Sequence, residues 1–182
     1  NYMTTHKDQK IIVFLNTCDS VDLYFKVFSR YVGDRNQIFG KMYVGKMHGD
    51  MKQAKRLAVY KEFDEQATGV LFATDVIARG IDFGKVDSIV QIDIPQDPNF
   101  YIHRIDRTAR KGTAGKALVI VQQSEEPYIE YLVEKVVGKH SPAANPRVQG
   151  PRVLQPGRQR GGQVRAEHAQ PDAHRQRLHR QE

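Results

Sequence analysis

The amino-acid sequence predicts an α/β fold in which helices cover both faces of a doubly wound parallel sheet. Short apolar runs alternate with amphipathic stretches about five times along the chain, and such alternation is typical of repeated strand–helix units. Most of the apolar runs are nearly continuous, as in strands that are buried on both faces. The connections between elements are short. These observations favour one folded body over residues 10–140.

Five strands are expected along this body. They comprise residues 10–16, 38–47, 69–73, 86–92 and 116–121. The first is almost continuously apolar between Lys10 and Asn16 and the third is a continuous run, whereas the second alternates loosely. Parallel sheets bind ligands at the carboxyl ends of their strands, so we expect the chemistry in the loops that follow them. Those loops begin after Phe14, Met47, Ala73, Ile92 and Val121.

Two helices are expected in the first half of the body. The first spans 18–31, because apolar residues recur there at intervals of three and four, and Gly33-Asp34 ends it. Its apolar stripe is Val21, Tyr24, Phe25 and Phe28. The second runs from Asp50 to Asp64, because Asp50 and Gln53 have the spacing of a capping box.

Two more helices are expected in the second half. Asp97-Pro98 predicts the N-cap and first turn of a short helix. A closing helix ends at Gly138. Its apolar stripe is Ile129, Leu132, Val133 and Val136.

The two ends of the chain differ from the body. Residues 1–9 are expected to be a linker. Residues 141–182 hold eight Arg, seven Gln, no Lys and no aromatic residue, which predicts a disordered basic tail. The tail carries +5 of the net charge of +7, so the body is nearly balanced. Two interpretations of the tail stay open: an RNA-binding arginine-rich segment, or a frame or gene-model artefact.

Cysteine content and hydropathy limit the class of protein. The single cysteine, Cys18, excludes an internal disulfide and fits a reducing compartment. We predict that Cys18 is an inert, small apolar residue near a helix start. No window approaches the roughly 18 continuous apolar residues of a membrane-spanning helix, and the first residues lack the apolar run of a secretory signal. No membrane partner is therefore expected.

One glycine pattern looks like a phosphate-binding loop. Residues 40–47 match a Walker A loop through Lys46, but Met47 stands where a Ser or Thr would hold Mg²⁺. The intervening residues have the pattern of a strand, and the next helix begins too late to point its N-terminus at a phosphate. We therefore do not expect a self-contained NTPase.

Polar clusters follow two of the predicted strands. Residues 48–56 place Gln53 and Arg56 on one face of a helix start, where amides and a basic side chain suit phosphodiester oxygens. Residues 73–82 bring Thr74 and Asp75 to the sheet edge. In the same cluster Gly80 permits close backbone approach, and Asp82 offers a carboxylate for ribose hydroxyls.

A third cluster spans residues 103–112. Arg107 and Arg110 are three residues apart on one helical face, and their planar groups suit phosphate oxygens. Arginines so placed can stabilise charge on a transferring phosphoryl group. Taken singly, each cluster also fits a capped helix or a solvent-exposed, salt-bridged face.

The order and spacing of the clusters is more specific than any one of them. The chain reads His48-Gly-Asp-Met-x-Gln-x-x-Arg56, then Thr74-Asp-Val-x-Ala-Arg-Gly-Ile-Asp82, then His103-Arg-Ile-x-Arg-Thr-Ala-Arg-x-Gly112. From about Lys10 to Leu132 it closely resembles the C-terminal helicase domain of DEAD-box RNA helicases. The stretches 70–75 and 124–129 are most similar to the ribosome-biogenesis members. This resemblance implies a RecA-like fold.

The resemblance also implies a role for each matching residue. Arg107 and Arg110 would be arginine fingers reaching the γ-phosphate of ATP, and His103 would couple two lobes. Asp82 would bind the ribose, with Gly80 close by. RNA-backbone contacts would come from Gly49, Gln53, Arg56, Thr74 and Asp75, with Arg79 supporting that loop. No metal ligand is expected in this chain.

Two departures from the family pattern bear on activity. Asp106 stands where the family has glycine, and its carboxylate could pair with Arg107, repel the γ-phosphate or point to solvent. The 182 residues contain no Asp-Glu-Ala-Asp box. The partner that binds most of the ATP, and its Mg²⁺, would be an N-terminal RecA-like lobe. We therefore expect this chain alone to be catalytically silent.

These implications lead to one expected function and two alternatives. We expect the C-terminal half of an ATP-dependent RNA helicase, which couples ATP hydrolysis to RNA binding and local duplex unwinding. The alternatives are a non-catalytic RNA- or protein-binding module and a DNA helicase or chromatin-remodelling half. The expected partner is RNA, bound with little sequence preference. We expect a monomer in the nucleus, within it the nucleolus, with the cytoplasm as the alternative.

Overall fold

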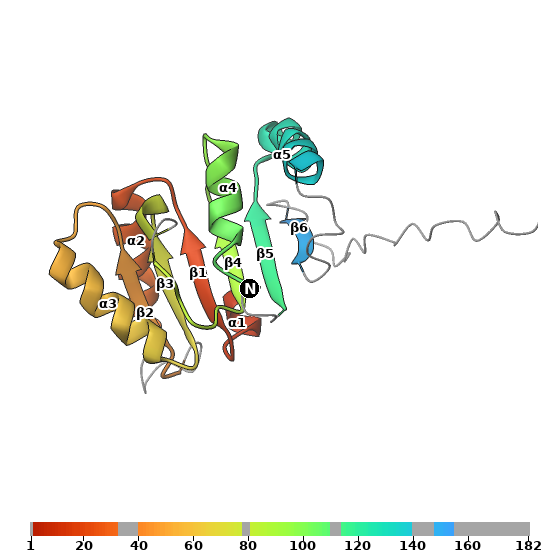
Figure 1. Cartoon of the computed structure of the whole chain (residues 1–182). Coiled ribbons are helices and arrows are strands. Elements are labelled where there is room, and N and C mark those ends of the chain that lie inside the picture. The colour runs from red at the N-terminus through yellow and green to blue at the C-terminus, as the bar shows by residue number, and fades with distance from the viewer. Residues whose placement is uncertain (1, 33–39, 78–80, 110–113, 140–147, 155–182) are drawn as a thin grey trace, which may run out of the picture.

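An open sheet with helices packed against it forms the body of the molecule (Figure 1). The computed structural model describes residues 2–32, 40–77, 81–109, 114–139 and 148–154. Its strands are β1 (Lys10–Phe14), β2 (Tyr43–Met47), β3 (Gly69–Ala73), β4 (Ser88–Gln91), β5 (Gly115–Ile120) and β6 (Val148–Leu154). All neighbouring strands are parallel, in the order β2-β3-β1-β4-β5-β6. The five predicted strands and the doubly wound parallel sheet are therefore confirmed.

A sixth strand lies in the segment for which the sequence predicts a disordered tail. Residues 148–154 form β6 and pair with β5 from Gly115↔Val148 to Ile120↔Leu154. The register shifts between Lys116 and Leu118, opposite Gly150-Pro151, and an irregularity of this kind accommodates proline in an edge strand. Composition averaged over the whole segment hides this short run. Residues 141–147 and 155–182 lie outside the described residues.

Helices alternate with the strands along the chain, largely as predicted. They are α1 (Tyr2–Thr5), α2 (Cys18–Ser29), α3 (Gln53–Glu65), α4 (Pro98–Ile105) and α5 (Glu126–Lys139), with 3-10 turns η1 (Asp75–Ile77) and η2 (Gln123–Glu125). Asp97 caps α4 as predicted, because its side chain accepts the Asn99 N–H at 2.8 Å.

The predicted capping box at Asp50 is wrong. Helix α3 begins at Gln53, and its N-cap is Lys52, which makes no side-chain cap hydrogen bond. Residues 48–51 instead form a turn in which the Met51 N–H donates to the His48 carbonyl at 3.3 Å. Met51 is buried under this turn, so burial of its side chain outweighs the local capping preference of Asp50.

Two apolar layers form the core, one on each face of the sheet. Ile12 and Phe14 of β1 pack with Phe63 of α3 on one face. Their neighbours Ile11 and Val13 point the other way and pack beside Val21 of α2. A smaller cluster, comprising Tyr101 of α4, Val119 of β5 and Leu132 of α5, extends the first face toward β5. Helices therefore cover both faces, as predicted.

The segment before β1 contains a helix, although it was expected to be a linker. The Tyr2 hydroxyl of α1 donates to Ser88 Oγ at 3.1 Å, and Tyr2 and Met3 pack against the α2 side of the core. These contacts hold the segment against the amino end of β4. None of the helices in the described part of the chain is long and apolar enough to cross a bilayer.

Candidate functional site

The carboxyl ends of three central strands meet at one edge of the sheet. Phe14 of β1 lies in register with Ala73 of β3 and with Gln91 of β4. The residues that follow these ends are polar, and the Asn16 N–H donates to Asp93 Oδ2 at 3.0 Å. The parallel register thus gathers polar groups from distant parts of the sequence at the edge where α/β sheets bind ligands.

Arg104 of α4 is the centre of this edge. Its side chain is 0% exposed, and it donates from Nε and Nη2 to the two carboxylate oxygens of Asp75 at 2.6 and 2.8 Å. Nη1 donates to Gln91 Oε1 at 3.2 Å and to the Asp93 carbonyl at 2.8 Å. Nη2 also donates to Asn16 Oδ1 at 2.9 Å. These bonds use the full donor capacity of a guanidinium, so the buried charge is completely solvated by protein.

Sequence reasoning did not find Arg104, because it stands in a run of charged residues that resembles a solvent-exposed face. Its spacing of three residues from Tyr101 could have indicated burial, because residues three apart lie on the same face of a helix. Tyr101 and Arg104 are both buried in α4. Asp75 was predicted to contact RNA. The structure gives its carboxylate an internal partner in Arg104, and the RNA contact stays a prediction.

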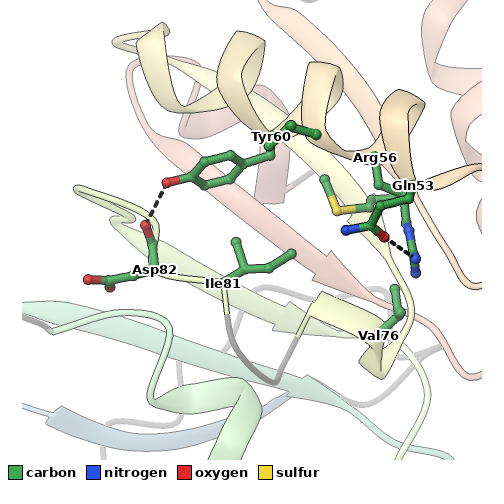
Figure 2. Close-up of a pocket in the computed structure, with 8 residues that line it drawn as sticks. Gln53, Arg56, Tyr60, Val76, Ile81 and Asp82 are labelled. Atoms are coloured by element: carbon green, nitrogen blue, oxygen red, sulfur yellow. Dashed lines mark hydrogen bonds between the residues drawn. The ribbon is translucent and has the colours of Figure 1, made fainter.

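A cleft of about 460 Å³ lies between α3 and the segment that follows β3 (Figure 2). It is lined by Met47, Gln53, Arg56, Leu57, Tyr60, Val76, Ile81 and Asp82. Figure 2 shows Gln53 and Arg56 at one end and Tyr60 with Asp82 at the other. The structure therefore brings two predicted RNA-binding residues and one predicted ATP-binding residue to a single cleft.

Both ends of this cleft are held by hydrogen bonds. At one end Arg56 Nη2 donates to Gln53 Oε1, one helical turn away. At the other the Tyr60 hydroxyl donates to the Asp82 carbonyl at 2.9 Å. Burial raises the pKa of Tyr60, with smaller contributions from Asp64 and Asp82, so this hydroxyl remains a donor at neutral pH.

One donor in the cleft has no acceptor among the described residues. Arg56 Nε is buried and makes no hydrogen bond there. The Arg56 side chain as a whole lines the cleft and brings a guanidinium there, a group that binds phosphate and carboxylate oxygens well. The cleft therefore suits an anionic, oxygen-rich ligand better than an apolar one.

Arg107 is fixed beside this cleft. It is 8% exposed, and its guanidinium donates to the carbonyl of Ile81 at 2.5 Å and to the carbonyl of His103 at 3.2 Å. Nη2 also lies 3.1 Å from Asp106 Oδ2. The pairing of Asp106 with Arg107, one of the outcomes considered from the sequence, is therefore present. Through Ile81, Arg107 is tied to the chain segment that carries Asp82.

His103 lies in α4, where its ring meets Phe100 edge-on. The remaining predicted site residues fall into two groups. Gly49 lies exposed in the turn between β2 and α3, and Thr74 is buried at the end of β3, where its N–H donates to the Met47 carbonyl at 3.2 Å. The other group, Arg79, Gly80 and Arg110, lies outside the described residues.

A second hollow, of about 300 Å³, is formed by the loops after β1, β4 and β5. Chemistry was expected in these loops. However, Asn16 in this hollow uses its amide to donate to the Ile94 carbonyl at 2.9 Å and its oxygen to accept from Arg104. These polar groups are satisfied internally, so the cleft beside α3 is the stronger candidate for a ligand site.

Comparison with known proteins places these features in one family. Residues 1–112 match the family described as the helicase conserved C-terminal domain. The chain is 38% identical to the probable ATP-dependent RNA helicase ddx55 of Dictyostelium discoideum, over 75% of this chain and 20% of that protein. It is 42% identical to DEAD-box ATP-dependent RNA helicase 32 of Arabidopsis thaliana, over 82% of this chain and 19% of that protein.

A human relative gives the same result, with the probable ATP-dependent RNA helicase DDX10 37% identical over 80% of this chain and 16% of that protein. The chain thus spans a fifth or less of the length of these relatives.

Solved structures agree with the sequence relatives. The structure of Mss116p DEAD-box helicase domain 2 bound to an RNA duplex superposes with a TM-score of 0.65 at 27% identity, covering 84% of this chain and 54% of that one. The C-terminal domain of the DEAD-box protein Dbp5 gives a TM-score of 0.60 at 28% identity, covering 81% and 75%. The predicted RecA-like fold is therefore confirmed, and the chain belongs to the helicase conserved C-terminal domain family, as the second RecA-like domain of a DEAD-box RNA helicase.

Proposed function

We propose that this chain supplies the C-terminal half of an ATP-dependent RNA helicase, which binds the RNA backbone and lends arginines to ATP held mainly by another lobe. The observation that carries the proposal is the cleft shared by Gln53, Arg56 and Asp82, with Arg107 fixed beside it. A related chain, Dbp5 of S. cerevisiae, is described as bound to RNA and ADP BeF3 (TM-score 0.61, 28% identity). The curated relatives carry the name of ATP-dependent RNA helicases.

The RNA contacts would be made mainly with phosphate and sugar. Arg56 brings a basic side chain to the cleft, and Gln53 begins α3 just after the turn that contains Gly49. Helix N-termini and arginines bind phosphate oxygens well. Thr74, Asp75 and Arg79 would complete this surface. Contacts of this kind position the strand without reading bases, so little sequence preference is expected.

The ATP contacts would come from the segment after β3 and from the end of α4. Asp82 would accept ribose hydroxyls with Gly80 nearby, while Arg107 and Arg110 would stabilise charge on the γ-phosphate. His103 would couple the two lobes. Among the eight residues that line the cleft, Asp82 is the single carboxylate, so we assign Mg²⁺ to the N-terminal lobe rather than to this chain.

The proposal extends to the setting of the protein. Most of the catalytic parts would belong to the N-terminal RecA-like lobe, so this chain alone would be inactive. By likeness to the relatives named ddx55 and DDX10, we place the whole protein in ribosome biogenesis, as a monomer in the nucleolus.

One observation favours a second function. The ion pair between Asp106 and Arg107 occupies the guanidinium that would otherwise reach the γ-phosphate. If this pair persists when ATP is bound, the chain would act as a non-catalytic RNA-binding module on the same fold. RNA binding is common to both functions, and ATP hydrolysis separates them.

A binding measurement tests RNA binding, which both proposed functions share. We expect the full chain to bind fluorescent single-stranded RNA more tightly than DNA of the same sequence, measured by anisotropy over a series of salt concentrations. Arg56→Ala should weaken RNA binding about tenfold and lower the salt dependence by about one phosphate contact. Lys61→Ala is the matched control, because Lys61 is an exposed base on α3 that does not line the cleft. Equal binding of RNA and DNA, or equal loss in the two variants, would contradict the proposal.

A further inference from the structure

Three side chains that could hold a metal ion come together where α2 begins and β2 ends. Cys18 begins α2, and His48 and Asp50 lie in the turn after β2. One ligand atom from each of them lies within 4.8 Å of the others. A thiol, an imidazole and a carboxylate converge here from two elements that are 30 residues apart in the sequence.

His48 is the residue that points to a ligand. Its side chain is 6% exposed, and its Nε2 lies 3.0 Å from Asp22 Oδ1. Nδ1 is buried and has no hydrogen-bond partner among the described residues. A neutral imidazole that donates from Nε2 to a carboxylate carries its lone pair on Nδ1. The ring is therefore held in the tautomer that leaves Nδ1 ready to bind a metal.

Asp22 and Lys46 give this arrangement its support. Lys46 Nζ lies 2.5 Å from Asp22 Oδ1, and the same oxygen lies 3.0 Å from His48 Nε2. A carboxylate that orients a histidine from behind is the usual partner of a metal-binding imidazole.

We infer that Cys18, His48 and Asp50 form a binding site for Zn²⁺ or a similar borderline-soft divalent metal, with Asp22 orienting His48. Thiolate, imidazole and carboxylate together are a donor set for zinc, whereas Mg²⁺ and Ca²⁺ prefer oxygen ligands throughout. Three protein ligands leave a fourth position of a tetrahedral site for water or another ligand.

The geometry needs only a small change to bind a metal. Zinc ligands lie at about 2.0–2.3 Å from the metal, so the most distant pair of ligand atoms must approach by roughly an ångström. Asp50 is exposed, and its side chain can make this movement without disturbing the core. The site would give Cys18 a function, in place of the inert role predicted from the sequence. The inference does not depend on the proposed helicase function.

Cobalt is a suitable probe, because Co²⁺ binds zinc sites and a thiolate–cobalt bond gives a strong near-ultraviolet charge-transfer band. The full chain has one cysteine, so this band reports on Cys18 alone, whatever the other histidines bind. We expect one equivalent of Co²⁺ to produce the band under anaerobic conditions, and Zn²⁺ to abolish it by displacement. Cys18→Ser should lose the band. His48→Gln and Asp50→Asn should weaken Co²⁺ binding at least tenfold.

Two further variants test how the site is built. Asp22→Asn should lower the affinity for Co²⁺ about 10- to 100-fold, because loss of a carboxylate behind a metal-binding histidine has an effect of this size. Asp19→Asn, an exposed acid beside Cys18, is the matched control and should leave binding unchanged. An absent band, or a band equally strong in His48→Gln and Asp50→Asn, would overturn the inference.

A measurement without substitutions covers the case in which a variant does not fold. Zn²⁺ should slow alkylation of Cys18 in the unmodified chain at least tenfold, whereas Mg²⁺ should have no effect. Equal alkylation rates with and without Zn²⁺ would overturn the inference independently.

Discussion

Arg104 and Asp75 form a two-point ion pair in which the arginine is fully buried and the carboxylate is 27% exposed. Nε and Nη2 of the fully buried arginine lie 2.6 and 2.8 Å from the two carboxylate oxygens. The pair joins α4 to the end of β3, and the further bonds of Arg104 reach the segments after β1 and β4. Arg107, three residues later, holds the segment before Asp82. The proposed RNA and nucleotide residues are thus linked by buried arginine contacts.

Breaking this pair from the acid side should destabilise the fold strongly. We expect Asp75→Asn to lower the free energy of unfolding by about 3 kcal/mol, because it leaves a buried guanidinium without its counter-charge. Urea unfolding followed by circular dichroism measures this. Asp106→Asn is the control, since Asp106 also pairs with an arginine but its side chain is 61% exposed. Its loss should cost less than about 1 kcal/mol. Equal losses of unfolding free energy in the two variants would contradict the structural role assigned to the ion pair of Arg104 and Asp75.

The close approach of β5 to the end of α4 should exclude side chains. A Cβ atom at Gly115 would lie 2.6 Å from the Ala109 backbone nitrogen and also clash with Thr108. Thr108 cannot give way easily, because it is buried and its hydroxyl donates to the Val86 carbonyl. We expect Gly115→Ala to lower the unfolding free energy by about 2 kcal/mol. At Gly49 the same change meets open space, so Gly49→Ala should be nearly neutral in thermal unfolding.

Alkaline unfolding should report on Tyr101. Burial raises the pKa of Tyr101 from 10.0 to about 12, so the unfolded chain ionises first as the pH rises. The resulting stability, roughly 2–3 kcal/mol for this difference, is complete below pH 10 and is lost between about pH 10 and 12. Phenylalanine at this position cannot ionise. We therefore expect the difference in unfolding free energy between the unmodified chain and Tyr101→Phe to become smaller as the pH rises across that range. Parallel curves for the two proteins would show that Tyr101 ionises normally.

Release of Arg107 from Asp106 should raise catalysis. In a two-lobe protein made by fusing a DEAD-box N-terminal lobe to this chain, we expect Asp106→Gly to increase RNA-stimulated ATP hydrolysis several-fold. The reason is that the Arg107 guanidinium loses its competing carboxylate partner and becomes available to the γ-phosphate. Steady-state phosphate release measures this. Unchanged or lower hydrolysis would mean that the ion pair does not restrain Arg107.

The fold could be predicted because its signals are local. Continuous apolar runs such as 10–14 and 69–73 have few alternatives to buried parallel strands, and Asp97-Pro98 fixes a helix start. The capping box at Asp50 was wrong because a tertiary contact outweighs the local preference there. Burial of Met51 moves the start of α3 past Asp50. The pairing of 148–154 with β5 has no signal in the composition of that segment.

The candidate site was predictable as a set of residues but not as a network. Motif spacing pointed to Gln53, Arg56, Asp82 and Arg107, and the structure places the first three around one cleft, with Arg107 beside it. No pattern along the chain indicates that Arg104 binds Asp75, because this contact depends on how α4 packs on the sheet. The pairing of Asp106 with Arg107 was one of three outcomes that the sequence left open.

ATP hydrolysis with RNA present tests the central claim most directly. The full chain would be assayed alone, then fused to a DEAD-box N-terminal lobe, and then in the fused form with Arg107→Ala. Arg30→Ala, at an exposed arginine beyond the end of α2, is the control. We predict no ATP hydrolysis by the chain alone and RNA-stimulated hydrolysis by the fusion. Arg107→Ala should lower the hydrolysis rate of the fusion at least about 100-fold. Hydrolysis by the chain alone, or full activity in the fused Arg107→Ala variant, would contradict the account.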